Sequence, residues 1–265
     1  MLRVGVFGSC RVHDPMKLAS KNAELVYKTD GFFGYVHSAP DVLQALRMLQ
    51  GELSAPHELY PLLSRNKTGG EYSIERRWNE YVDEVDVFVV EISSVRIFAY
   101  ESYSLQINRF KQRVRELADG ASGGEAFLMG SSEWLRLLDK AKGGALSDLD
   151  RSLIEAYREY EQSAEGLAED LDAIAALLQK PVVFVGHVNT DRRGQPIRQR
   201  AVICQTLEEF AATGRGWFLD PTPIVQGYGY DKAMTDSAHF ADDFQAFYSK
   251  KLVEKLLSWS PYHVD

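Results

Sequence analysis

The sequence predicts an α/β protein built on a doubly wound, mostly parallel sheet. Short apolar runs with strand composition alternate with helical patterns along most of the chain. The run Val85–Ile92 is almost continuously apolar, which is typical of a strand covered on both faces. Five strands are expected, at Leu2–Phe7, Glu24–Lys28, Val85–Ile92, Pro181–Gly186 and Gly216–Leu219.

Helices are expected between these strands and after the last one. Apolar residues recur at helical spacing in Pro40–Gln50, Ile197–Ala212 and Ala241–Trp259. A longer periodic run predicts one helix from about Ser147 to Gln179, within a helical insertion at about residues 100–179. This helix is expected to pack on one face of the sheet and partly roof a cleft. The arrangement is flavodoxin-like, with helices on both faces of about five strands, and residues 1–265 are expected to form one domain.

Composition narrows the classes of function. The chain has 265 residues, 45% of them hydrophobic, and a net charge of -8, which argues against a nucleic-acid partner. No apolar stretch approaches the roughly 20 residues that span a bilayer, and the N-terminus lacks the pattern of a signal peptide, so a cytoplasmic location is expected. Cys10 and Cys204 belong to no Cys-x-x-Cys pair, so no metal site is expected.

Ligands of open parallel sheets bind beyond the carboxyl ends of the strands, so the residues after each strand are the candidates. Asp236 and His239 are three residues apart, just before the final helix. Such a carboxylate can orient the imidazole toward a nucleophile at the end of the first strand. Taken alone, each feature also has a simpler interpretation. Gly8-Ser9 can be a turn with a helix N-cap, and the Asp-x-x-His segment can be a capped surface turn.

Together these segments resemble the SGNH/GDSL hydrolase superfamily. Val6–Cys10 resembles the family's first block, Asp30–Gly34 its second, and Asp236–Phe240 its Asp-x-x-His block. The third block departs from the pattern, because Ser93-Ser94-Val95-Arg96 stands where the family has Gly-x-Asn-Asp. The Gly-Ser-Cys form of the first block is similar to the GSCFA group and to bacterial capsular-polysaccharide acetyltransferases.

The resemblance implies a catalytic triad. Cys10 aligns with the family's nucleophilic serine, His239 with its base and Asp236 with the residue that orients the base. Ser9, one position earlier, remains a competing nucleophile. A cysteine at a helix N-terminus beside a histidine is expected to have a lowered pKa and to form a thiolate near neutral pH.

The same resemblance implies an oxyanion hole. The backbone N–H of Gly34 and that of Cys10 would hold the oxyanion. The family's asparagine donor is absent, so a hydroxyl or a backbone N–H of Ser93 or Ser94 would have to replace it.

Further candidates line the expected pocket or its rim. The residues assigned to substrate binding are Arg11, His37, His187, Asn189, Arg192 and Arg193. For His187 and Asn189 a turn is an equally good interpretation. Arg192, Arg193, Arg198 and Arg200 form a dense basic cluster, which is either a solvated helix start or a site for an anion such as a cofactor phosphate or a sugar acid.

Two functions follow from this pattern. The first is SGNH-type acyl-ester chemistry, by an esterase or an O-acyltransferase, on a small-molecule or carbohydrate ester or a polysaccharide precursor. It requires no cofactor, and acyl-CoA is a candidate donor. The alternative is a non-catalytic SGNH-like protein that binds a glycan or a nucleotide sugar. The altered third block favours this alternative.

A dinucleotide-binding loop is disfavoured because Gly8-Ser9-Cys10-Arg11 lacks the Gly-x-Gly-x-x-Gly pattern. The sequence leaves the oligomeric state open.

Overall fold

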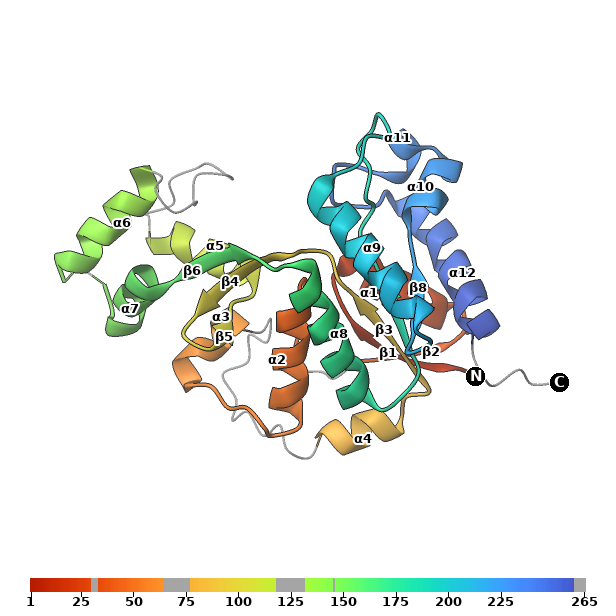
Figure 1. The fold of residues 1–265 in the computed structure, drawn as a ribbon, viewed down its shortest axis with the longest axis horizontal. Coiled ribbons are helices and arrows are strands. Elements are labelled where there is room, and N and C mark those ends of the chain that lie inside the picture. The colour runs from red at the N-terminus through yellow and green to blue at the C-terminus, as the bar shows by residue number, and fades with distance from the viewer. Residues whose placement is uncertain (30–32, 64–76, 118–131, 145, 260–265) are drawn as a thin grey trace.

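The central element is a five-stranded parallel sheet in the order β2-β1-β3-β7-β8, seen near the middle of Figure 1. The structure is a computed structural model that describes residues 1–29, 33–63, 77–117, 132–144 and 146–259. The strands are β1 (Arg3–Phe7), β2 (Val26–Lys28), β3 (Val87–Glu91), β7 (Val182–Val185) and β8 (Trp217–Leu219). All four pairings are parallel, and the order is that of flavodoxin-like folds. The prediction of a doubly wound α/β fold is confirmed.

Helices cover both faces of this sheet (Figure 1). On one face, α1 (Cys10–Lys21) packs against α12 (Asp242–Trp259). On the other face, α8 (Ala164–Leu178) lies between α2 (Ala39–Leu49) and α9 (Arg198–Ala212) and contacts both. This is the two-sided cover that parallel strands require, because connections between parallel strands cross over a face of the sheet.

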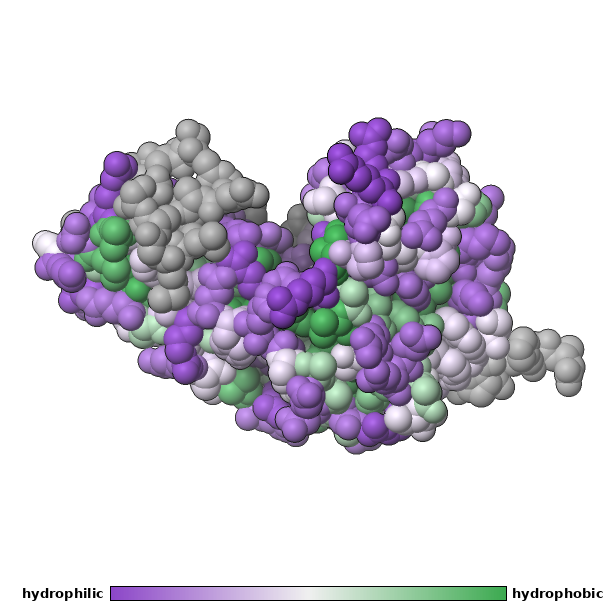
Figure 2. Space-filling model, turned by 45° about the horizontal axis from the view of Figure 1, so that its top comes forward, coloured by the Kyte–Doolittle hydropathy of each residue, from purple (hydrophilic) through white to green (hydrophobic). Residues whose placement is uncertain are grey.

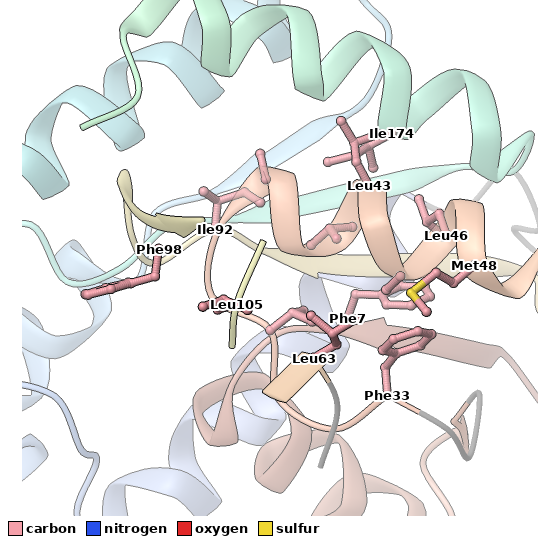
Figure 3. Packing of buried hydrophobic residues seen from close by; sticks show 14 of the residues in the cluster. Phe7, Phe33, Leu43, Leu46, Met48, Leu63, Ile92, Phe98, Leu105 and Ile174 are labelled. Atoms are coloured by element: carbon pink, nitrogen blue, oxygen red, sulfur yellow. The ribbon is translucent and has the colours of Figure 1, made fainter. Parts of the chain in front are cut away.

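The apolar residues of β3 alternate between the two layers. Val87 and Val89 belong to the core cluster that includes Phe244 of α12, whereas Phe88 and Val90 belong to the cluster beneath α2 and α8. Figure 3 shows this second cluster, with Leu43 of α2 and Ile174 of α8 lying toward each other. Strand periodicity therefore divides one continuous apolar run between two cores.

The prediction of one long helix from Ser147 to Gln179 is wrong. The segment contains α7 (Asp148–Ala156), then β6 (Arg158–Glu161), and only then α8. Tyr157 is extended, with φ −59° and ψ 140°, and its ring stacks on Phe110 at a centroid distance of 4.6 Å. The strand β6 pairs antiparallel with β4 (Arg96–Tyr100), so tertiary pairing and aromatic packing outweigh the helical periodicity.

The predicted insertion is accordingly not purely helical. It contains α5 (Ile107–Leu117), α6 (Ser132–Lys142) and the strands β5 (Tyr103–Ser104) and β6, which form a second sheet with the preceding β4 in the order β5-β4-β6. These helices and α7 extend to the left of the parallel sheet in Figure 1. The remaining elements are η1 (His57–Leu59), α3 (Tyr60–Leu63), α4 (Arg77–Asp83), α10 (Thr222–Tyr228) and α11 (Tyr230–Ala233). Among the described helices, none combines the length and apolar character needed to cross a bilayer.

Gly8 allows the end of β1 and the start of α1 to lie against β3. A Cβ at this position would lie 2.5 Å from Cγ2 of Val12 and 2.7 Å from Cβ of Glu91. Both distances are too short for any side chain, so the two elements would have to separate. The close approach that builds the turn after β1 therefore depends on this glycine.

We expect Gly8→Ala to lower the free energy of unfolding by about 1–3 kcal/mol through overpacking. Urea denaturation measures this change. Gly227→Ala is the matched control, because no atom lies within 4 Å of a Cβ placed there in α10. Equal stabilities of the two variants would contradict the assigned role of Gly8.

Candidate functional site

A cavity of about 360 Å³ lies beyond the carboxyl ends of β1, β3 and β7, where open parallel sheets bind ligands. Residues of α1, α5 and α9 contribute to this cavity, and Figure 2 shows a hollow between the part carrying α6 and α7 and the part carrying α9 to α11. Its lining consists of Ser9, Cys10, Arg11, Tyr35, His37, Ser93, Ser94, Ile107, Asn108, His187, Arg200, Ala238 and His239.

A larger cleft of about 770 Å³ lies between the small sheet and α2 and α8. Its described lining contains neither a cysteine nor a histidine. By size alone this cleft would be the better candidate for the functional site. The groups suited to nucleophilic and acid–base chemistry, however, line the smaller cavity.

Glu91, the last residue of β3, is fully buried and holds the first turn of α1. Its Oε2 accepts hydrogen bonds from the backbone N–H of Ser9 at 2.7 Å and from the Ser9 hydroxyl at 2.6 Å. Its Oε1 accepts from Nε of Arg11 at 2.7 Å and lies 2.6 Å from Nη2. Burial alone would raise the pKa of Glu91, but the Arg11 charge and the Ser9 hydrogen bonds outweigh it and the pKa lies below its usual value.

Arg11 connects this turn to two other segments. Its Nη1 donates to the carbonyl of Ala238 at 2.8 Å and lies 2.8 Å from Nε2 of His187. A guanidinium can only donate, so Nε2 of His187 accepts and the ring proton is on Nδ1. Burial, followed by the charges of Arg11 and Arg200, holds the pKa of His187 well below its usual value, so this ring is neutral.

Cys10 is the first residue of α1 and is partly exposed to the cavity, whereas Ser9 is only 2% exposed. The Ser9 hydroxyl donates to Glu91 and accepts the N–H of Arg11 at 3.3 Å, which is an N-cap. Of the two candidate nucleophiles, Cys10 therefore has the side chain that is not committed to the helix start.

The expectation that the pKa of Cys10 is lowered is wrong. Burial raises the pKa of this thiol, the carboxylates of Glu91 and Asp14 raise it further, and the charge of Arg11 opposes them only in part. Here desolvation and two nearby carboxylates outweigh the helix dipole, whose effect is modest. The thiol is neutral at pH 7, and a base must remove its proton during any attack.

Asp236 and His239 form a preorganised pair. Nδ1 of His239 lies 2.8 Å from Oδ2 of Asp236, and Oδ1 of the same carboxylate accepts the N–H groups of Ala238 at 2.6 Å and His239 at 2.8 Å. The hydrogen bond from His239 and these N–H groups hold the pKa of Asp236 below its usual value. The ionised carboxylate therefore accepts from Nδ1 and leaves Nε2 as the basic nitrogen.

His239 and Cys10 line the same cavity, but no hydrogen bond joins their side chains in the part of the chain that the structure describes. The side chains of His239 and Asp236 are 60% and 56% exposed. Access to the cavity from this side is therefore open.

The third-block serines line the cavity, but their donors are engaged. The N–H groups of Ser93 and Ser94 both donate to the carbonyl of His37, at 2.8 and 2.9 Å. The Ser94 hydroxyl bonds within its own turn, to the backbone of Arg96. In this conformation neither serine offers a backbone N–H to an oxyanion, so of the two kinds of donor expected from the sequence only a serine hydroxyl remains.

His37 lines the cavity beside Asn108, a residue that the sequence analysis did not consider. Nε2 of His37 lies 3.2 Å from Nδ2 of Asn108, and Nδ1 lies 3.2 Å from Oγ of Ser93. Burial lowers the pKa of His37. Asn108, the second residue of α5, therefore brings a side-chain amide to the cavity from a distant segment. No local sequence signal could have identified it.

Several candidates lie outside the cavity lining. Asn189 donates its N–H to Oγ1 of Thr222, 33 residues away in the sequence, at 2.9 Å and is not part of the lining. Arg192 pairs with Asp231 at the surface, and Arg193 is exposed. Of the basic cluster, only Arg200 reaches the cavity.

Of the second block, residues 30–32 lie outside the described residues. Gly34 is half-buried and is not part of the lining, although its neighbour Tyr35 is.

Replacing Glu91 by Gln leaves the buried Arg11 charge without a partner, so we expect a loss of about 3 kcal/mol in the free energy of unfolding at pH 7. Urea denaturation measures it, with exposed Glu155→Gln as the control. The pKa of Glu91 is lowered in the folded state. The contribution of the Glu91 carboxylate to the free energy of unfolding is therefore complete above the ordinary glutamate pKa and is lost only as pH falls below about 4. A difference between E91Q and the parent protein that disappears already at pH 6 would contradict this ion pair.

Iodoacetamide is expected to alkylate Cys10 before Cys204. Cys204 is buried, its thiol lies 3.5 Å from the carbonyl of His187, and burial raises its pKa to about 12. Because the pKa of Cys10 is raised as well, its rate at pH 7 should be below that of a free thiol and should increase up to pH values above 9. Mass spectrometry of the two cysteine peptides follows both sites. A Cys10 rate that is already maximal at pH 7 would indicate a thiolate and contradict this assignment.

Comparison with known proteins places the whole arrangement in a family. The TviD N-terminal domain family matches residues 2–255. The Vi polysaccharide biosynthesis protein TviD of Salmonella typhi is 22% identical over 277 aligned positions, which cover 100% of this chain and 33% of that protein. The chain thus spans about a third of the length of this relative. Because the family match includes every strand of the parallel sheet and every described residue of the cavity, the chain belongs to the TviD N-terminal domain family.

Proposed function

We propose that the chain catalyses acyl-ester chemistry on a carbohydrate, as an O-acyltransferase or an esterase of the SGNH type, with Cys10, His239 and Asp236 as its triad. One observation carries this proposal. An imidazole already oriented by a carboxylate lines the same cavity as Cys10, a cysteine at a helix N-terminus.

The first half-reaction forms a thioester. Nε2 of His239 takes the thiol proton as Sγ of Cys10 attacks the acyl carbonyl carbon, and Asp236 stabilises the imidazolium that forms. Collapse of the tetrahedral intermediate breaks the bond to the leaving group, which takes the proton from His239. Because the resting thiol is neutral, proton removal and attack must be coupled.

The second half-reaction releases the acyl group. His239 removes a proton from water or from a sugar hydroxyl, whose oxygen attacks the thioester carbonyl. When the intermediate collapses, the thiolate leaves and recovers the proton from His239. Water as the acceptor gives an esterase, and a sugar hydroxyl gives an acyltransferase.

Two donors are suited to stabilise the oxyanion. The N–H of Cys10 is at the first position of α1 and so has no partner within the helix. The Nδ2 amide of Asn108 has a second N–H beyond the one facing His37. Asn108 would supply the amide that the SGNH family carries in its third block.

The carbohydrate part of the proposal rests on the family. The related TviD of Salmonella typhi is named as a protein of Vi polysaccharide biosynthesis, and the family match includes the cavity. A polysaccharide or its precursor is therefore the proposed substrate class, and an acyl-CoA is a suitable donor.

A second candidate function is glycan or nucleotide-sugar binding without catalysis. The raised pKa of Cys10 favours it, because a neutral thiol without a hydrogen bond to His239 is a weak nucleophile. The two candidates differ in whether turnover depends on this residue pair.

Cys10→Ala and His239→Ala should each reduce kcat/KM for acetyl-ester hydrolysis or transfer by at least about 10³-fold, since both act on the reacting atoms. Asp236→Asn should cost about tenfold or more through loss of orientation. Steady-state kinetics with 4-nitrophenyl acetate and with acetyl-CoA plus oligosaccharide acceptors would measure this.

Ser9→Ala is the control for the neighbouring hydroxyl. This change removes the hydroxyl that donates to Glu91 and caps α1, so it should lower the free energy of unfolding. The variant should retain most of the activity at a temperature where it is folded. Activity that survives Cys10→Ala but not Ser9→Ala would make the protein a serine enzyme. Binding of a glycan with no turnover in the parent protein would favour the second candidate.

A further inference from the structure

Arg200 is a charged residue of the cavity that the proposed triad does not use. It is the third residue of α9, and its side chain lines the cavity together with Cys10 and Asn108. Its Nη1 donates to the carbonyl of Val188 at 3.1 Å, which orients the guanidinium from the end of the β7 strand.

The charge of Arg200 is not neutralised by a carboxylate. Among the described residues, no Asp or Glu lies within ion-pair distance of it, whereas Arg11 in the same cavity is paired with Glu91 at 2.6 Å. The Arg11–Glu91 pair carries no net charge, and His187 is neutral. Arg200 therefore supplies the uncompensated positive charge of the cavity, in a chain whose overall charge is -8.

Its neighbours in sequence differ from it. Arg198 is exposed on the same helix, and Arg192 is paired with Asp231 at the surface. A guanidinium that is partly removed from water and faces a cavity gains from an anion there, because its own hydration is incomplete and a carboxylate or phosphate accepts two parallel hydrogen bonds.

We infer that Arg200 binds an anionic group, a carboxylate or a phosphate, of the substrate. This inference deepens the proposed function and rests on it for the identity of the bound molecule as a substrate. It makes Arg200 a specificity-determining residue, since a neutral ester would leave the charge unpaired.

Matched esters test the preference. Phenyl acetate is compared with 4-acetoxybenzoate, which adds a carboxylate, and S-acetyl-N-acetylcysteamine is compared with acetyl-CoA, which adds phosphates. Arg200→Gln should lower kcat/KM for the charged member of at least one pair by about tenfold, which corresponds to about 1.4 kcal/mol. For the neutral member of the same pair, kcat/KM should fall by less than twofold. Arg198→Gln is the matched control and should change neither.

The affected pair identifies the anion. A loss confined to 4-acetoxybenzoate indicates a carboxylate, and a loss confined to acetyl-CoA indicates the phosphates of the donor. Equal losses for charged and neutral esters, or no loss for any, would overturn the inference.

Alkylation of Cys10 gives a readout that does not require catalysis. Iodoacetate carries one negative charge that iodoacetamide lacks. The rate of Cys10 alkylation by iodoacetate is divided by its rate with iodoacetamide, and this ratio is normalised to the same ratio for a free thiol. A higher normalised ratio indicates a more positive potential in the cavity. Arg200→Gln should reduce this normalised ratio by about threefold at low salt and less at high salt. If the parent protein turns over no ester, the proposed function fails, and this ratio alone decides the inference. An unchanged ratio in Arg200→Gln would then overturn it.

Discussion

The buried ion pair between Glu91 and Arg11 is the interaction on which the rest of the site depends. Glu91 is the last residue of the central strand β3, and through Arg11 it connects the start of α1 to His187 after β7 and to the carbonyl of Ala238 before α12. A buried charge of either sign would be costly alone, so each residue requires the other. Three segments that are far apart in the sequence are thereby held around one cavity.

The same pair explains why two adjacent residues with similar chemistry have different environments. The Ser9 hydroxyl is engaged on both sides, as donor to Glu91 and acceptor from the Arg11 N–H. Cys10, at the next position, lines the cavity instead. The Glu91 carboxylate that stabilises the turn also raises the pKa of Cys10 and so disfavours a thiolate there. The proposed reaction therefore needs a base outside the buried network, and the exposed Asp236–His239 pair is suited to that role.

Local patterns predicted those features of the fold that depend on local sequence. The five strands, their parallel direction and the helices on both faces follow from alternating periodicities, and the Asp-x-x-His segment forms the hydrogen bond expected of it. The long helix failed at Tyr157, where stacking on Phe110 and pairing with β4 come from residues far away in the sequence. Glu91 and Asn108 were missed for the same reason, since each reaches the site only through the tertiary fold. The basic cluster was recognised as a group, but only the fold separates Arg200 from its exposed neighbours.

In the proposed reaction Cys10 carries the acyl group, on a first turn of α1 that Glu91 organises. The most direct measurement is rapid acid quenching of the protein with an acetyl donor, followed by peptide mapping of the acetylated residue by mass spectrometry. We expect an acetyl group on Cys10 that neutral hydroxylamine removes, as it does a thioester. An acetyl group on Ser9 that resists neutral hydroxylamine, or turnover without any acylated residue on the first turn of α1, would contradict it.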